Sequence, residues 1–121
     1  HWNEIPASTL NIRNAPSTSG QIIAQMHKGD TVNIYIMENN WCKISRTEDK
    51  WCSYSYIRSV KGTVSNCSRL NCRRSPISGQ AAFILSANDT VNILHQDTAT
   101  GWYYIEFQKK TGYVSNKYIK L

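Results

Sequence analysis

The sequence predicts an all-β protein made of two tandem small β-barrels. Residues 30–34 read Asp-Thr-Val-Asn-Ile, and the same five residues recur at positions 89–93. No stretch of the chain has the 3.6-residue apolar period of an amphipathic helix. Instead, short runs of alternating apolar and polar residues are separated by turn-forming residues. Five or six such runs in about 60 residues are typical of a small barrel.

The repeat extends to both sides of this identical stretch. The matching residues are Leu10 and Leu70, Arg13 and Arg73, Pro16 and Pro76, Trp41 and Trp102, Ile44 and Ile105, and Tyr56 and Tyr118. The offset between copies varies, and the length changes fall between matched blocks, where loops tolerate them. We therefore expect two domains, residues 1–61 and residues 62–121. A domain of ~60 residues buries only ~60% of its unfolded surface, so its own core is marginal. We therefore also expect stabilising cross-links, or packing of one copy on the other.

The first copy contains five runs with strand character. Residues 10–13 alternate apolar and polar positions, and in residues 31–37 the side chains of Val32, Ile34 and Ile36 share one side. The turns between the runs contain residues such as Pro16, Gly29 and paired asparagines. Strands are expected at residues 10–13, 21–25, 31–37, 41–45 and 50–54, with turns at 14–20, 27–30, 38–40 and 46–49.

The second copy repeats this order of strands. Its expected strands are residues 70–73, 81–84, 90–95, 102–107 and 111–115, with a closing strand in residues 117–121. Residues 59–63 link the copies without a proline- or serine-rich tract. So short a link is expected to allow little independent movement.

Four cysteines are candidate staples: Cys42, Cys52, Cys67 and Cys72. Four cysteines allow three pairings, of which we expect Cys42–Cys52 across a hairpin and Cys67–Cys72 within a short turn. Three of them take positions that are apolar in the other copy. Disulfides indicate an oxidising, extracellular location. The alternatives are four buried free thiols in a cytosolic protein, or a zinc site, for which no histidine has ligand spacing.

The charge pattern limits the classes of partner. The formal net charge of +6 permits attraction to an anionic surface such as wall polymer, nucleic acid or membrane. No basic run is longer than two residues, so an arm that binds nucleic acid is not indicated. The longest apolar run, residues 81–85, is too short to span a bilayer. The chain begins at His1 without a visible signal peptide, so we expect a mature product or part of a longer parent.

Six short motifs occur in the same order in both copies. In the second copy they are Leu70-Asn71, Arg73, Pro76, residues 88–91, Trp102 with Ile105, and residues 112–119. This set resembles the bacterial SH3 (SH3b) domain over nearly the whole chain. The sequence departs from that pattern at residues 50–52, where the family usually has Gly-Trp/Tyr-Val, and at Cys72, where it usually has Val.

The resemblance implies two tandem SH3-like barrels that bind cell-wall peptide and do not catalyse. Such modules commonly flank peptidoglycan hydrolases, namely NlpC/p60-type cysteine endopeptidases, amidases or muramidases. Their known ligands are peptidoglycan stem peptides or cross-bridges.

The chain lacks the residue patterns of a catalyst. A cysteine nucleophile needs a histidine partner, yet neither His27 nor His95 recurs in the other copy, and the Asp-Cys-Ser-Gly signature of NlpC/p60 enzymes is absent. The recurring Asp30 and Asp89 precede strands, where an aspartate bonds its own backbone, so they are not an opposed glycosidase pair. We expect no catalytic residue, cofactor or metal site.

Binding residues are nominated by the resemblance to SH3-like barrels. In such barrels the tryptophan at a strand start edges a groove near the first-strand arginine and the closing tyrosine. The nominated residues are Arg13, Trp41, Tyr54 and Tyr56 in the first copy and Arg73, Trp102, Asn116 and Tyr118 in the second. The arginines can hold a carboxylate bidentately or point into solvent, and the tryptophans can line a groove or seal the core.

These observations give one leading hypothesis and three rivals. The leading hypothesis is a secreted, cell-wall-associated, non-catalytic region that targets a peptidoglycan hydrolase to peptidoglycan. The rivals are a protein–protein module for extended peptides, a module that packs on and regulates a catalytic domain of the parent chain, and a spacer in a toxin or adhesin.

Overall fold

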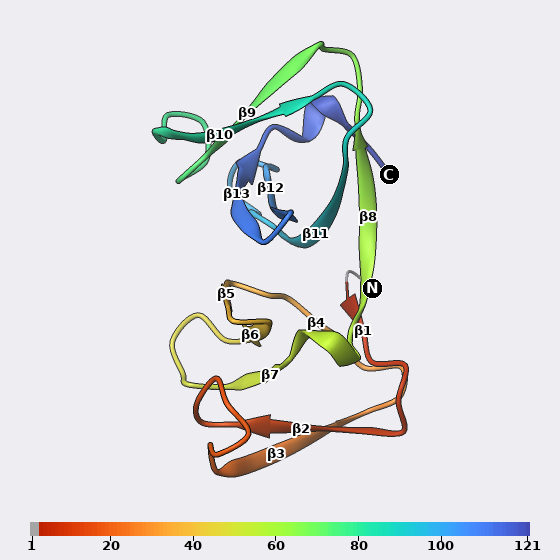
Figure 1. The fold of residues 1–121 in the computed structure, drawn as a ribbon, viewed down its shortest axis with the longest axis vertical. Coiled ribbons are helices and arrows are strands. Elements are labelled where there is room, and N and C mark those ends of the chain that lie inside the picture. The colour runs from red at the N-terminus through yellow and green to blue at the C-terminus, as the bar shows by residue number, and fades with distance from the viewer. Residues whose placement is uncertain (1–2) are drawn as a thin grey trace. The chain divides into compact units, whose positions relative to one another are not determined.

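The chain forms two compact all-β units, divided between Ser59 and Val60. Figure 1 shows the computed structural model, which describes residues 3–121. Within these residues the regular structure consists of strands and two short 3₁₀ helices, so the all-β prediction is confirmed. The expected domain boundary at residues 61 and 62 stays a prediction, because compactness does not test whether either part folds alone.

The first unit has one antiparallel sheet in the order β3-β2-β7-β6-β5. A separate short strand, β1, pairs with β4 and with Arg58 and Ser59 at the start of β8. The elements are β1 (Asn3–Glu4), β2 (Thr9–Arg13), β3 (Ile22–His27), β4 (Thr31–Val32), β5 (Ile36–Glu38), β6 (Trp41–Lys43), β7 (Trp51–Ser53) and η1 (Tyr54–Tyr56).

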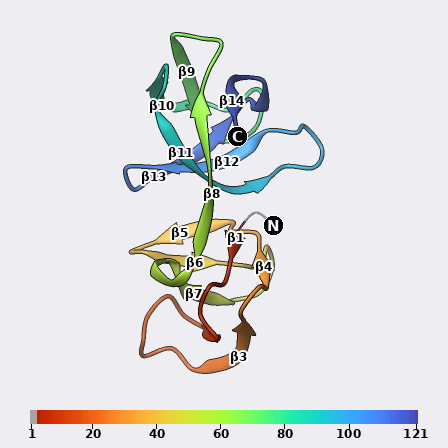
Figure 2. The same ribbon diagram turned by 90° about the vertical axis from the view of Figure 1, so that its right-hand side faces the viewer.

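The second unit repeats this order as β10-β9-β13-β12-β11 and continues to β8. Figure 2 shows β9 and β10 from a second direction. The strand β14 pairs with β8 and closes the unit. The elements are β8 (Arg58–Val64), β9 (Arg69–Arg73), β10 (Ala81–Ser86), β11 (Thr90–Gln96), β12 (Tyr103–Phe107), β13 (Lys110–Val114), η2 (Asn116–Tyr118) and β14 (Ile119–Lys120).

The repeated residues supply the cores and the turns. Leu10 and Leu70 are buried in their units, as are Ile34 and Ile93. The recurring aspartates close the turns, because the Oδ2 atoms of Asp30 and Asp89 accept hydrogen bonds from the backbone N–H groups of His27 and Ser86, both at 2.8 Å. The structural role predicted for both aspartates is confirmed.

The first unit does not form the single strand expected at residues 31–37. Ile34 is fully buried, but Ile36 is 44% exposed, so the two side chains do not share an inner face. The segment changes partner along its length, because β4 pairs with β1 and β5 pairs with β6. In the second unit β11 remains one strand, and a register shift between Ile93 and His95 leaves three successive residues buried.

Two further expectations differ from the structure at the connections. Residues 59–63 are part of β8 and not a free link, since residues 60–63 pair with β11. The expected closing strand is present as β14, but it is shorter than residues 117–121 because the 3₁₀ turn η2 precedes it.

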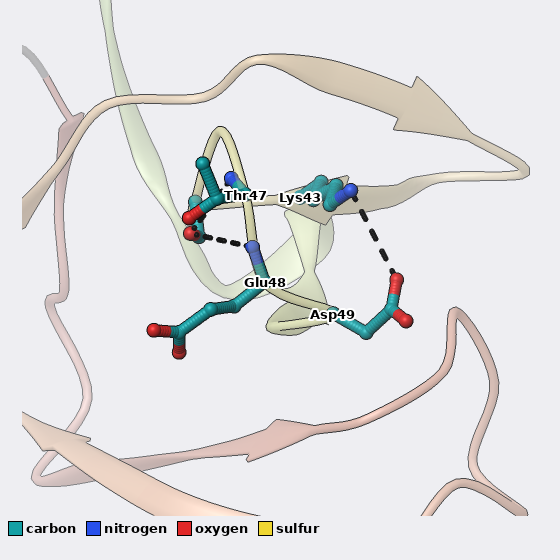
Figure 3. A network of polar contacts seen from close by, with 5 residues as sticks. Lys43, Thr47, Glu48 and Asp49 are labelled. Atoms are coloured by element: carbon teal, nitrogen blue, oxygen red, sulfur yellow. Dashed lines mark hydrogen bonds and ion pairs between the residues drawn. The ribbon is translucent and has the colours of Figure 1, made fainter.

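The hairpin between β6 and β7 is closed by local polar contacts (Figure 3). The Oγ atom of Ser45 accepts hydrogen bonds from the backbone N–H groups of Thr47 at 3.3 Å and Glu48 at 3.1 Å. The ammonium group of Lys43 lies 3.9 Å from the carboxylate of Asp49. Because that carboxylate is exposed, the ion pair adds little stability, and the serine contacts define the turn expected at residues 46–49.

The expected disulfides are absent, and all four cysteines are free thiols. Cys42 and Cys52 lie opposite each other on β6 and β7, but their sulfur atoms are 3.5 Å apart, far beyond the ~2.05 Å of a disulfide. The Cys42 thiol also contacts the Cys52 carbonyl at 3.3 Å. In the other predicted pair, Cys72 is fully buried and Cys67 is half-buried. Cys42, Cys52 and Cys72 therefore act as small core residues.

Burial of these thiols changes their acidity. The hydrogen bond with Cys52, together with burial, raises the pKa of Cys42. Burial raises the pKa of Cys72 to about 12, from an ordinary value of 9.0. The Cys72 sulfur lies directly above Gly112, where an added Cβ atom would come within 2.5 Å of it. A thiol packed this tightly stays neutral at physiological pH.

Cys72→Val is expected to reduce the loss of stability at alkaline pH. Above pH 9 the unfolded state releases the Cys72 proton while the folded state keeps it until about pH 12, so the folded state loses stability as the pH rises. The wild-type loss between pH 7 and pH 10 should exceed that of Cys72→Val by about 1 kcal/mol. Urea unfolding in reductant at both pH values measures this difference.

The control is Ile93→Val, a core change without a titrating group. It should lower stability by about 1 kcal/mol at both pH values alike. An unchanged pH dependence in Cys72→Val would contradict the assignment of this effect to the buried thiol.

Candidate ligand-binding grooves

Each unit has a groove at the same place in its fold. The groove of the first unit has a volume of about 530 Å³, and its lining comes from the β1–β2 segment, β2 and the loop after it, the start of β6, the end of β7 and η1. Its lining residues are Ala7, Thr9, Leu10, Asn11, Arg13, Thr18, Trp41, Ser53 and Tyr56.

The groove of the second unit has a volume of about 760 Å³. It is lined from the equivalent elements: β9 and its flanking loops, the segment before β12, and η2. Its lining residues are Asn66, Cys67, Arg69, Leu70, Asn71, Arg73, Ile77, Thr100, Trp102, Ser115, Asn116, Lys117 and Tyr118.

The two linings share six pairs of identical residues at equivalent positions. They are Leu10 and Leu70, Asn11 and Asn71, Arg13 and Arg73, Trp41 and Trp102, Ser53 and Ser115, and Tyr56 and Tyr118. The duplicated sequence thus produces a duplicated groove.

The arginine of each groove is fixed by the loop that follows its strand. The Nη1 atom of Arg13 donates a hydrogen bond to the carbonyl of Gly20 at 2.9 Å, and Arg73 does the same to Gly79 at 3.0 Å. A guanidinium group has five N–H donors, so this bond leaves others for a ligand. The arginine therefore orders the loop and also lines the groove.

The tryptophan of each groove is half-buried, whereas Trp51 in β7 is only 7% exposed. Trp41 opens β6, and Trp102 stands directly before β12. Both residues line their grooves and keep part of their surface exposed, which fits the predicted groove role. The predicted tyrosines complete the rims, with Tyr56 58% exposed and Tyr118 37% exposed.

One nominated residue lies apart from its groove lining. The hydroxyl group of Tyr54 is 2.5 Å from the Oγ atom of Ser59, and Tyr54 is not among the residues that line the first groove. Its equivalent in the second unit, Asn116, lines the second groove.

Sequence reasoning missed several lining residues. Ser53 and Ser115 follow a cysteine and a valine at equivalent positions, and the Leu-Asn pairs recur unchanged in both copies. A search for residues identical in both copies would have found all of these. Arg69, Ile77 and Lys117 differ between the copies, so the repeat gave no signal for them.

The linings suit recognition and lack a catalytic constellation. They offer amide, hydroxyl and guanidinium groups beside aromatic rings, a combination common in recognition sites. Among the described lining residues there is no histidine and no carboxylate. Within residues 3–121 no cluster of three or more metal-ligating side chains occurs. The same residues include no helix long and apolar enough to cross a membrane.

These features define a tandem pair of SH3-like β-barrels, each with an aromatic groove. The sequence pattern of the Bacterial SH3 domain matches residues 8–58 and again residues 68–120. The chain therefore belongs to the bacterial SH3 domain family, and the predicted tandem SH3-like fold is confirmed.

Individual proteins resemble the chain across both units. The "Cell wall-binding protein YwsB" of Bacillus subtilis (strain 168) is 27% identical over 93% of this chain and 68% of its own length. The structures of NlpC2 and NlpC1 from Trichomonas vaginalis each align with 98% of this chain at a TM-score of 0.51, with 17% and 18% identity. The chain spans 47% and 45% of those two proteins, and at this identity the likeness shows the fold alone.

Arg73→Ala is expected to loosen the loop after β9. The substitution removes the hydrogen bond to the Gly79 carbonyl, which should cost about 1 kcal/mol and speed amide exchange in residues 74–80. Hydrogen exchange measured by NMR checks this, with Arg74→Ala, a change at an exposed neighbour outside the lining, as the control. Equal exchange in the two variants would contradict the loop-fixing role of Arg73.

Proposed function

We propose that this chain is a non-catalytic region that binds the bacterial cell wall through its two grooves. The observation that carries the proposal is the duplicated groove, in which arginine, tryptophan and tyrosine recur at equivalent positions. The similarity to a Bacillus protein named as cell wall-binding supports the same ligand. Peptidoglycan is the wall polymer that we propose, through its stem peptide or cross-bridge.

The chemistry of the grooves fits a peptide ligand. Extended peptides present backbone amides, which the asparagine and serine side chains of the linings can bond. The half-buried faces of Trp41 and Trp102 offer flat apolar surface to aliphatic side chains. The arginine in each groove can donate two parallel hydrogen bonds to a terminal carboxylate.

Two grooves in one chain would strengthen attachment to a polymer. If each groove binds weakly, simultaneous binding to neighbouring peptides raises the overall affinity by ~10²- to 10⁴-fold. The formal net charge of +6 adds a general attraction to an anionic wall. Retention on the wall would then depend on both grooves.

The parent protein is proposed to be a secreted peptidoglycan hydrolase that this region targets to its substrate. The fold likeness to two NlpC proteins, of which this chain spans less than half, motivates a catalytic domain elsewhere in the parent. The reaction would then belong to that domain, and the region described here would position it.

A pull-down on purified sacculi tests the binding. Trp41→Ala and Trp102→Ala should each reduce retention because avidity is lost, and the double variant should reduce it further because no intact groove remains. Far-ultraviolet circular dichroism should stay native, since both rings lie at the edges of their units. Tyr35→Ala, which changes a half-buried aromatic residue outside the linings, is the control.

Three results would contradict the proposal. They are wild-type retention no higher than that of denatured chain, equal loss of retention in Tyr35→Ala, and release of soluble wall fragments by the purified chain alone.

A further inference from the structure

The two grooves differ in charge. Among the described lining residues, Arg13 is the one charged residue of the first groove. The second groove is lined by three cations, Arg69, Arg73 and Lys117, and by no described acidic residue. The ion pairs found in the described chain, Lys43–Asp49, Lys50–Glu48 and Arg58–Glu4, involve none of the groove cations.

The difference arises from two substitutions between the copies. Arg69 stands where the first copy has Thr9, and Lys117 stands where it has Ser55. The Ser55 hydroxyl accepts a hydrogen bond from Asn40 at 2.6 Å. Both grooves contain the first-strand arginine, Arg13 or Arg73. The extra positive charge of the second lining therefore comes from Arg69 and Lys117.

We propose that the second groove selects wall peptides with more than one free carboxylate, while the first groove, with one arginine, discriminates less between acid and neutral peptides. This inference rests on the proposed wall-binding function. Arg73 is held by the Gly79 carbonyl and can offer its other donors to one carboxylate. Arg69 and Lys117 are exposed and lie in the same lining, where a second carboxylate can meet them.

The lining also favours a peptide over a polyol phosphate as the anion. Trp102, Tyr118 and the 60%-exposed Ile77 line the same groove, and a ligand that covers them must carry apolar groups. A stem peptide has aliphatic side chains next to its carboxylates, whereas a chain of polyol phosphates has no apolar surface to bury. The mixed lining therefore matches an anionic peptide.

NMR titration of the full chain can read each groove separately. The probes are a synthetic stem tetrapeptide with free carboxylates and the same peptide with its carboxylates amidated. The indole N–H signals of Trp41 and Trp102 report the first and second grooves. At the Trp102 signal the acid form should bind about three- to tenfold more tightly than the amide, because two extra exposed ion pairs contribute modestly. At the Trp41 signal, where Arg13 is the one charged lining residue, the ratio should be smaller than at the Trp102 signal.

Charge swaps between the copies assign this preference to two residues. Arg69→Thr with Lys117→Ser should reduce the preference at Trp102 to that seen at Trp41, and Thr9→Arg with Ser55→Lys should increase the preference at Trp41. The control, Arg74→Thr with Lys120→Ser, removes the same charge from exposed positions outside the lining and should keep the preference. Far-ultraviolet circular dichroism verifies the fold of each variant.

Several outcomes would overturn the inference. They are equal affinity of the Trp102 site for both peptides, a control variant that loses the preference equally, and tighter binding of a glycerol phosphate oligomer than of the acid peptide. If sacculi retain the chain while acid and amide peptides bind alike, the proposed function stands and the charge selection fails. If sacculi do not retain the chain, the proposed function fails too.

Discussion

Each groove depends on one hydrogen bond, donated by the first-strand arginine to a glycine carbonyl across the next loop. Arg13 makes it to Gly20 and Arg73 makes it to Gly79. The bond fixes the guanidinium group and the loop together, so one residue defines both the wall of the groove and a binding group. Because the bond uses a backbone acceptor, it tolerates changes in loop side chains, and the two loops do differ in sequence.

The small size of each unit divides the aromatic residues between core and groove. A unit of about 60 residues can fill only a narrow interior, and here the interior is mostly aliphatic, with Trp51 and Tyr103 as large buried rings. Trp41 and Trp102 remain half-buried at the edge, and Tyr56 and Tyr118 stand on 3₁₀ turns beyond the sheet. The rings that the core does not enclose supply the recognition surface.

The duplication made much of the fold predictable, because positions retained in two copies reveal their structural roles, and the resemblance to SH3-like barrels supplied the groove residues. Seven of the eight nominated groove residues line a groove, the exception being Tyr54. Properties found in one copy alone were not predictable: the break after β4 comes from a change of strand partner. The prediction that Cys42 and Cys52 lie opposite each other across the hairpin is confirmed. Sequence alone cannot decide whether two neighbouring sulfur atoms are bonded.

Hydrogen exchange on intact sacculi tests most directly whether both grooves hold the wall. We predict that binding slows exchange in residues 9–20 and 53–56 of the first unit and in residues 69–79 and 115–118 of the second. The edge strands β3 and β10, which lie outside the linings, should exchange as in the free chain. Protection confined to these edge strands, or absent from both grooves, would contradict the account.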